Sequence, residues 1–308
     1  MRKLKLGFVA ALCMLWSASP GVADGSHSAG YFPNLPVVDQ DGKIYALYDD
    51  LIKGKIVVVN FIYTHCPDLC PLTTARMSQL QKTLGDKLGR DVFFYSITVD
   101  PKRDTPAELK KFADAFGAKS GWRFLTGDPD SIKKISHALG DRSRKLSEHR
   151  NEIVIGNDAT GVWARNSLMG DLASVEMEIR GMEPGWRPGG VATGNQNLAD
   201  KVYDSSTVPG KAMFTKLCAP CHAVGGDDRV GPDLADVTTR RPRQWLMEFI
   251  MFPDRMRQRN DPDTMALLKK YPGAMMPQLG LTTQDATDII DFLGQFAEKQ
   301  KKSTPKTN

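Results

Sequence analysis

The C-terminal third of the chain contains a five-residue run that restricts its chemistry more than any other feature, Cys218-Ala219-Pro220-Cys221-His222. Its Cys-x-x-Cys-His spacing is the pattern of covalent haem attachment, in which two thiols reach one haem edge and the imidazole lies under the iron. A zinc half-site or a dithiol redox pair would not require the histidine, and no second Cys/His pair follows to complete a zinc site. The sequence therefore predicts haem bound through Cys218, Cys221 and His222.

The segment around this run, residues 207–299, shows only helical patterns and resembles a class I cytochrome c, an all-α fold. Gly231-Pro232 stands where such proteins place a turn beside the proximal histidine, and Met276-Pro277 stands before the last helix. The resemblance implies Met276 as the second iron ligand, with Met275 as the next choice. His/Met ligation raises the haem potential and suits electron transfer. The remaining candidates are Met251, Met256 and Met265.

A second cysteine pair, Cys66 and Cys70, follows a continuous β-branched and aromatic run at residues 56–63 and opens a helical pattern at residues 71–88. A helix N-terminus lowers the pKa of a thiol, and thiolates are soft ligands that select copper(I). Three residues separate the cysteines, one more than in thioredoxin-type oxidoreductases. The spacing leaves metal binding, thiol–disulfide exchange and a structural disulfide open.

Strand and helix patterns alternate through residues 31–180, which predicts a sheet layered with helices in the thioredoxin-like arrangement. The strand patterns lie at residues 56–63, 92–99, 122–125, 153–155 and 162–164, and the helical patterns at residues 71–88, 106–116 and 131–139, with one last helix. Thr105 is the expected N-cap of the second helix because Pro106 suits a first helical position. The predicted fold is thus an α/β thioredoxin-like domain followed by an all-α cytochrome c domain.

The first domain resembles the Sco (SenC) family of copper chaperones over residues 31–180. The resemblance rests on the Cys-Pro-Asp-x-Cys-Pro loop at residues 66–71 and on Val-Asp-Pro-Lys-Arg-Asp-Thr-Pro at residues 99–106. It implies one copper ion bound by Cys66, Cys70 and a distant histidine, which we assign to His149. His137, within a predicted helix, and His65, beside the first cysteine, are the alternatives.

The N-terminus is typical of a secretory signal peptide, which we predict over residues 1–23. Its apolar stretch, residues 6–16, is too short to span a bilayer, so we expect the segment to be removed. The protein would associate with a membrane only if the segment stays uncleaved as an N-terminal anchor. We predict a Gly/Pro-rich linker over residues 181–206 and a basic tail over residues 300–308. Removing Arg2, Lys3 and Lys5 reduces the formal net charge from +5 to +2, since 5 − 3 = 2. Three lysines lie in the tail, and Lys299 stands directly before it. This balance does not support nucleic-acid binding.

Together these features predict an exported, periplasmic copper-binding and electron-transfer protein rather than a turnover enzyme. As the resemblance implies, it would handle or reduce copper for assembly of a respiratory oxidase, with the oxidase copper subunit or another periplasmic redox protein as partner. The alternatives are a thiol–disulfide oxidoreductase that uses the Cys66/Cys70 pair with the haem, and a copper redox sensor. Because haem iron passes one electron and disulfide reduction takes two, copper(II) reduction matches the haem more directly.

Overall fold

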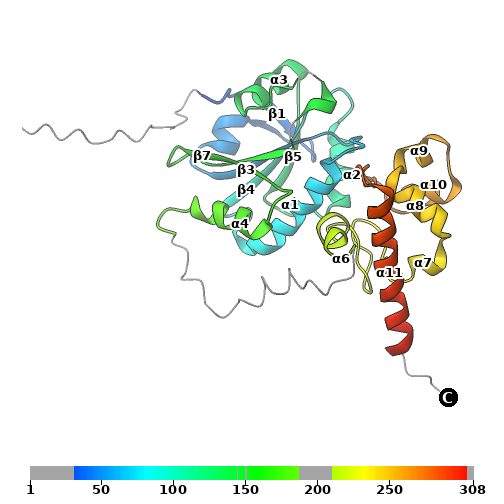
Figure 1. Ribbon diagram of the computed structural model, residues 1–308. Helices are drawn as coiled ribbons and strands as arrows, with labels where there is room; N and C mark the ends of the chain where they lie inside the picture. The colour runs from blue at the N-terminus through cyan, green and yellow to red at the C-terminus, as the bar shows by residue number, and fades with distance from the viewer. Residues whose placement is uncertain (1–30, 144, 150, 187–209, 304–308) are drawn as a thin grey trace, which may run out of the picture.

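A mixed seven-stranded sheet and a separate group of helices make up the computed structural model, which describes residues 31–143, 145–149, 151–186 and 210–303 (Figure 1). The predicted signal peptide and most of the predicted linker lie outside the described residues. The sheet and its covering helices occupy residues 31–186, here called the sheet part. The helices from residue 210 onward are called the helical part.

The centre of the sheet is formed by three parallel strands, β3 (Ile56–Ile62), β4 (Val92–Thr98) and β5 (Trp122–Thr126). Every residue of β3 is buried, which explains its nearly unbroken apolar sequence. The strand order is β2-β1-β5-β4-β3-β6-β7. The outer strands pair antiparallel and are β1 (Pro36–Asp39), β2 (Ile44–Ala46), β6 (Glu152–Asn157) and β7 (Val162–Ser167). The hairpin β1–β2 was not predicted because its strands are only four and three residues long.

Helices cover both faces of the sheet. One core layer lies under α1 (Cys70–Leu84), α2 (Pro106–Ala115) and α4 (Leu172–Gly181). The other lies under α3 (Pro129–Ala138) and η1 (Leu47–Ile52). As predicted, Thr105 caps α2, since its side chain accepts a hydrogen bond from the Glu108 amide. The fold thus confirms a thioredoxin-like sheet that presents the loop after β3 at the start of α1.

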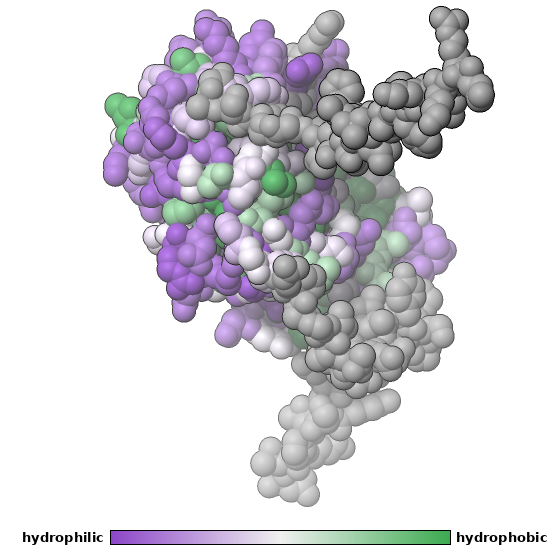
Figure 2. All heavy atoms as spheres, turned by 90° about the vertical axis from the view of Figure 1, so that its left-hand side faces the viewer, coloured by the Kyte–Doolittle hydropathy of each residue, from purple (hydrophilic) through white to green (hydrophobic). Residues whose placement is uncertain are grey.

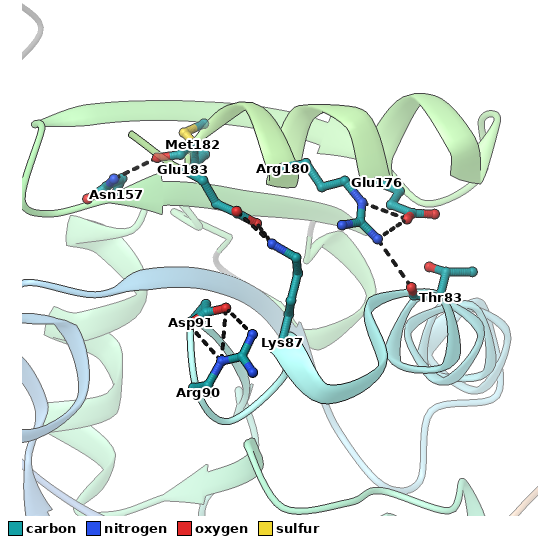
Figure 3. Close-up of polar contacts among 9 residues, drawn as sticks. All are labelled: Thr83, Lys87, Arg90, Asp91, Asn157, Glu176, Arg180, Met182 and Glu183. Atoms are coloured by element: carbon teal, nitrogen blue, oxygen red, sulfur yellow. Dashed lines mark hydrogen bonds and ion pairs between the residues drawn. The ribbon is translucent and has the colours of Figure 1, made fainter. Parts of the chain in front are cut away.

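Polar contacts hold α4 and the residues after it against the end of α1, the turn that follows α1, and β6 (Figure 3). Lys87 Nζ donates to both carboxylate oxygens of Glu183, at 2.7 and 2.6 Å. Asn157 Nδ2 donates to the Met182 carbonyl at 2.7 Å, and Arg180 reaches the Thr83 carbonyl at 3.4 Å. These contacts place residues 182–186 on the sheet part, although the predicted linker was expected to begin at residue 181.

The helical part contains short elements and one long helix. They are α6 (Lys211–Met213), η4 (Phe214–Cys218), α7 (Val237–Arg240), α8 (Arg243–Met251), α9 (Pro253–Gln258), α10 (Pro262–Lys270) and α11 (Thr283–Ser303). Helix α9 was not predicted as a separate element. Proline at its first position breaks the run from α8, because it lacks the amide proton needed to continue a helix.

A capping box opens α11. The Asp285 amide donates to Thr282 Oγ1 at 3.2 Å, and the Thr282 amide donates to Asp285 Oδ2 at 2.8 Å. The helix continues to Ser303, so its last turn occupies part of the predicted basic tail. This long helix contacts α6, α7 and α8 and so organises the helical part.

Polar side chains predominate on the face of the molecule shown in Figure 2, with single apolar side chains between them. The exposed large apolar residues of the described chain include Ile44, Val162 and Met177, which lie on different elements. Scattered apolar residues of this kind are ordinary on a protein surface. Within the described residues, none of the helices has the length and apolar character needed to cross a membrane.

Candidate metal centres

The loop after β3 places two cysteines at the N-terminal end of α1. Cys70 is the first residue of this helix, and Pro71 follows in the first turn, where a missing amide proton costs nothing. The Cys66 amide donates to the Tyr63 carbonyl at 3.1 Å, which turns the loop back on itself. Both cysteines are buried, with at most 1 % exposure, and both are free thiols. The chain thus holds two reduced thiols at a helix end away from solvent.

His149 reaches the same place from a distant part of the chain. It ends the short turn η3 (Leu146–Glu148), before β6, and is 9 % exposed. Its Nε2 lies 3.2 Å from Cys70 Sγ, and the ligand atoms of Cys66, Cys70 and His149 all lie within 4.8 Å of one another. The edge of its ring packs against Tyr63, with 5.4 Å between ring centroids. The sequence-predicted thiol–thiol–imidazole set is therefore brought together.

The donor chemistry of this set fits a soft metal ion. Among the described residues, no hydrogen-bond partner is present for buried His149 Nδ1, so the ring is held by its contacts with Cys70 and Tyr63. Two thiols and one imidazole favour copper(I) over hard cations, which prefer oxygen ligands. The site is closed to water on most sides, which suits an ion that must be kept from side reactions.

The two thiols differ in acidity. A hydrogen bond from Cys70 lowers the pKa of Cys66 to about 4, against the opposing effect of burial and with help from His149. Burial, followed by the interaction with Cys66, raises the pKa of Cys70. Burial also raises the pKa of Tyr63, whose hydroxyl interacts with Cys66. At neutral pH the metal-free site therefore contains one thiolate and one thiol.

Buried Asp104, which belongs to the run at residues 99–106, fixes the start of the cysteine loop. Its Oδ2 accepts hydrogen bonds from the Thr64 amide at 3.1 Å and from Thr98 Oγ1 at 2.6 Å. Its Oδ1 accepts from Thr64 Oγ1 at 2.6 Å. This carboxylate therefore ties the loop after β3 to the end of β4. In the sequence, this position is marked by its place in the run at residues 99–106. The structure adds the reason, because a carboxylate buried between two strand ends needs hydrogen-bond donors from both.

The alternative histidines lie apart from the thiols. The side chain of His65 is 43 % exposed, and its Nδ1 lies 2.8 Å from Thr64 Oγ1. His137 is an exposed residue of α3. Neither belongs to the cluster of potential metal ligands found among the described residues, which contains Cys66, Cys70 and His149.

The second centre is formed at the end of η4 and in the loop after it. The amides of Cys221 and His222 both donate to the Cys218 carbonyl, at 3.0 and 2.9 Å, and this turn brings the three side chains together. His222 Nδ1 donates to the Pro232 carbonyl at 2.9 Å, which leaves Nε2 with a free lone pair. A Cβ on Gly231 would lie 2.5 Å from the His222 ring, so only glycine allows this approach.

An apolar pocket opens in front of His222, with both cysteines on its wall. Its lining includes Phe214, Leu234, Leu246, Phe249, Leu268, Leu281, Ile289 and Leu293. Burial raises the pKa of Cys218 and of Cys221 to about 12 and lowers the pKa of His222, so all three groups are neutral here. Neutral imidazole is the form that binds iron, and an apolar pocket beside Cys-x-x-Cys-His fits a haem.

The methionine candidates are separated by their positions. Met275 and Met276 both line the same pocket as His222. Arg257 Nη1 donates to the Met276 carbonyl at 3.1 Å and fixes the backbone there. Met256 is completely buried, and Met265 is 42 % exposed, and neither lines the pocket. Among the methionine candidates for the iron ligand, Met275 and Met276 are therefore the two that line the pocket.

Comparisons with known proteins divide the chain in the same way. The model of the SCO1/SenC family matches residues 30–158, and the model of the cytochrome c family matches residues 207–297. The SCO1 protein homolog of Bacillus subtilis is 42 % identical over 90 residues, which cover 29 % of this chain and 45 % of that protein. Protein sco1 of Schizosaccharomyces pombe is 36 % identical over 139 residues, covering 41 % of this chain and 52 % of the relative. This chain spans about half the length of the curated relatives it matches.

Solved structures resemble the sheet part. A SCO1/SenC family lipoprotein from Bacillus anthracis is 28 % identical, with a TM-score of 0.44, and the match covers 49 % of this chain and 94 % of that one. ScoI of Bradyrhizobium japonicum, solved with copper bound, is 27 % identical, with a TM-score of 0.41. That match covers 48 % of this chain and 96 % of ScoI. Residues 30–158 belong to the SCO1/SenC family and residues 207–297 to the cytochrome c family, so this chain joins a Sco domain to a cytochrome c domain.

Proposed function

We propose that this chain is an exported copper-binding and electron-transfer protein that handles or reduces copper for assembly of the binuclear copper site of a respiratory oxidase. A covalent haem would serve as its one-electron partner. The convergence of Cys66, Cys70 and His149 on one buried point carries the proposal. A Sco protein related to the sheet part is described as a member of a family of cytochrome c oxidase assembly proteins, and another was solved with copper bound. A cytochrome c domain is suited to electron transfer.

Copper is the cargo of the first centre. Cys66 offers a thiolate, Cys70 a thiol that loses its proton when a metal binds, and His149 its imidazole Nε2. Three ligands leave a coordination position that an acceptor protein could use, so the ion is held tightly and can still be passed on. Burial of all three side chains restricts access to partners that dock over the loop.

Haem is the group that fits the second centre, where it would supply reversible one-electron chemistry. Cys218 and Cys221 would hold it by thioether bonds, and His222 would ligate the iron through Nε2, because Nδ1 is occupied by the Pro232 carbonyl. We assign the sixth ligand to Met276. The surrounding apolar side chains exclude water and so favour electron transfer over oxygen chemistry.

The deciding experiment is an anaerobic copper(I) titration of the haem-loaded protein against a competing chelator. We expect one tightly bound copper(I) per chain in the wild type. The double variant Cys66→Ser/Cys70→Ser should lose this binding while its haem spectrum is unchanged, because the two centres use different ligands. Equal copper binding by the wild type and the double variant would refute the proposal.

A second function, thiol–disulfide exchange, is favoured by one specific observation. The low pKa of Cys66 beside the raised pKa of Cys70 resembles an attacking thiolate with its resolving thiol. This function predicts that Cys66 and Cys70 form a disulfide in air and reduce a disulfide substrate repeatedly. Loose copper binding combined with such turnover would select this function over copper handling.

Export to the periplasm belongs to the proposal as well, because the segment that predicts it lies outside the described residues. Haem attachment through Cys-x-x-Cys-His and free thiols that bind copper(I) are both compatible with an exported redox protein. We propose the copper subunit of a respiratory oxidase as the receiving partner, and other periplasmic redox proteins as electron partners.

A further inference from the structure

A backbone hydrogen bond links the two centres. The Gln278 amide donates to the Pro67 carbonyl at 2.8 Å. Pro67 follows Cys66 directly, and Gln278 is two residues after Met276. A short path of covalent bonds and one hydrogen bond therefore runs from the proposed copper ligand to the proposed iron ligand.

The first turn of α1 also forms part of the wall of the haem pocket. Pro71 and Leu72 line this pocket together with Cys221 and Met276. Pro71 and Leu72 are buried, and the preceding residue, Cys70, contacts His149. The same helical turn thus borders the copper site on one side and the haem pocket on the other.

Further contacts hold the helical part on the sheet part, and Figure 1 shows it beside α1 and α2. Arg76 Nη1 reaches the Lys216 carbonyl at 3.4 Å, and Ala274 packs against the core under α1 and α2. Gly273 lies so close to α2 that a Cβ there would stand 2.5 Å from the Lys111 carbonyl oxygen. The two parts therefore touch at several points around the Pro67–Gln278 hydrogen bond.

We propose that the haem and copper centres form a docked electron-transfer pair, coupled through the Pro67–Gln278 hydrogen bond rather than by chance encounter on a flexible tether. In the transfer, a haem held by Cys218, Cys221 and His222 would give up one electron, from the ferrous to the ferric state, and one copper(II) held by Cys66, Cys70 and His149 would take it up as copper(I). One electron moves, no bond forms or breaks, and no proton is required. This inference rests on the proposed function, and it adds the interface and the route.

The first test measures the transfer itself. Copper(II) is bound to haem-loaded protein, the haem is reduced by a light pulse, and its reoxidation is followed in the haem absorption bands. A docked pair predicts a rate independent of protein concentration and of added sucrose. A rate that falls in proportion to solvent viscosity would mean that the centres must first diffuse together, and it would overturn the proposal.

The second test separates the parts with a small wedge. Gly273→Ala adds a methyl group against the Lys111 carbonyl, whereas Gly280→Ala adds one where nothing lies within 4 Å. Both glycines have positive φ, +83° and +64°, so the two variants carry comparable backbone strain. We expect reoxidation to slow in Gly273→Ala and to match the wild type in Gly280→Ala. Equal rates in both variants would contradict a docked pair.

A third readout needs no copper. In haem-loaded, copper-free protein, the Gln278 amide should exchange slowly with deuterium because it is hydrogen-bonded across the interface. In Gly273→Ala, the added methyl group should weaken the interface and speed the deuterium exchange of the Gln278 amide about tenfold. An unprotected wild-type amide would overturn the docked interface.

The tests separate this inference from the function beneath it. If the wild type binds no copper at Cys66 and Cys70, the proposed function fails, and the electron route falls with it. If copper and haem are both bound while the Gln278 amide is unprotected or the rate follows viscosity, only the docked pair fails.

Discussion

Nε2 of His149 lies 3.2 Å from Sγ of Cys70, although 79 residues separate them along the chain. The contact exists because the turn η3 ends beside the N-terminus of α1, where β3 and β6 are neighbours in the sheet. It completes a set of two sulfurs and one nitrogen at a buried point. The consequences of this geometry can be measured.

His149→Ala should weaken copper(I) binding by at least about 100-fold, because even indirect supports of metal ligands are worth up to about that factor. The matched control is His137→Ala, which removes an exposed imidazole of α3. Competition with a copper(I) chelator gives both affinities. Similar losses in the two variants, or a loss confined to His137→Ala, would show that the wrong histidine has been assigned.

Asp104→Asn should loosen the cysteine loop, because an amide cannot accept all three hydrogen bonds from Thr64 and Thr98 with the same strength. We expect a loss of about 2 kcal/mol in the free energy of unfolding of the sheet part and weaker copper binding. Denaturant unfolding and copper titration measure the two effects. Asp100→Asn serves as the control. Asp100 accepts the Arg103 and Asp104 amides through its backbone carbonyl, so these hydrogen bonds are kept when its side chain is changed.

In metal-free protein, the Cys66 thiolate should persist in acid. Its pKa is lowered to about 4, so the charged form is present above that pH and is lost as the pH falls through it. The ultraviolet absorbance of the thiolate, followed against pH, reports the transition, and Cys66→Ser should abolish it. Cys70→Ala should move the transition to higher pH, because the hydrogen bond from Cys70 is the largest cause of the shift. A transition near the ordinary pKa of a thiol in the wild type would be the opposite result.

Met276→Ala should remove the sulfur ligand of the haem iron and lower its reduction potential, since methionine ligation raises it. The sulfur-to-iron charge-transfer band of the ferric protein and a redox titration test this directly. Met275→Ala is the comparison, because both side chains line the pocket. Loss of the band in Met275→Ala alone would transfer the assignment to that residue.

Gly231→Ala should reduce haem incorporation, because the new Cβ would stand 2.5 Å from the His222 ring and force the imidazole out of place. Overpacking of this kind costs about 1–3 kcal/mol. Gly226→Ala, whose Cβ would meet its nearest atom at 3.9 Å, is the control. The haem content of purified protein, measured by absorbance per chain, should fall only in the first variant.

Much of the fold was predictable because its signals are local. Burial of β3 on both faces produces an unbroken apolar run, and the N-caps of α2 and α11 use short motifs. The short hairpin β1–β2 carries too few residues for a period to show. The break between α8 and α9 depends on one proline inside an otherwise helical pattern.

The candidate sites divide in the same way. Cys66 and Cys70 are four positions apart, so their spacing is visible in the sequence. The run Cys218–His222 is visible for the same reason. The placement of His149 depends on tertiary structure, and sequence periodicity alone does not show it. The contacts of Pro67 with Gln278, and of Leu72 with the haem pocket, join distant segments and leave no mark on local spacing.

Cys70 and Leu72 stand two residues apart in one turn of α1, and each belongs to a different centre. Adding or deleting one residue between Cys70 and Leu72 would rotate one of these side chains by about 100° around the helix axis relative to the other. The helix could then no longer present a copper ligand to one centre and a wall residue to the haem pocket at the same time. An engineered exchange of either half for a relative's must therefore preserve the spacing of these two residues within α1.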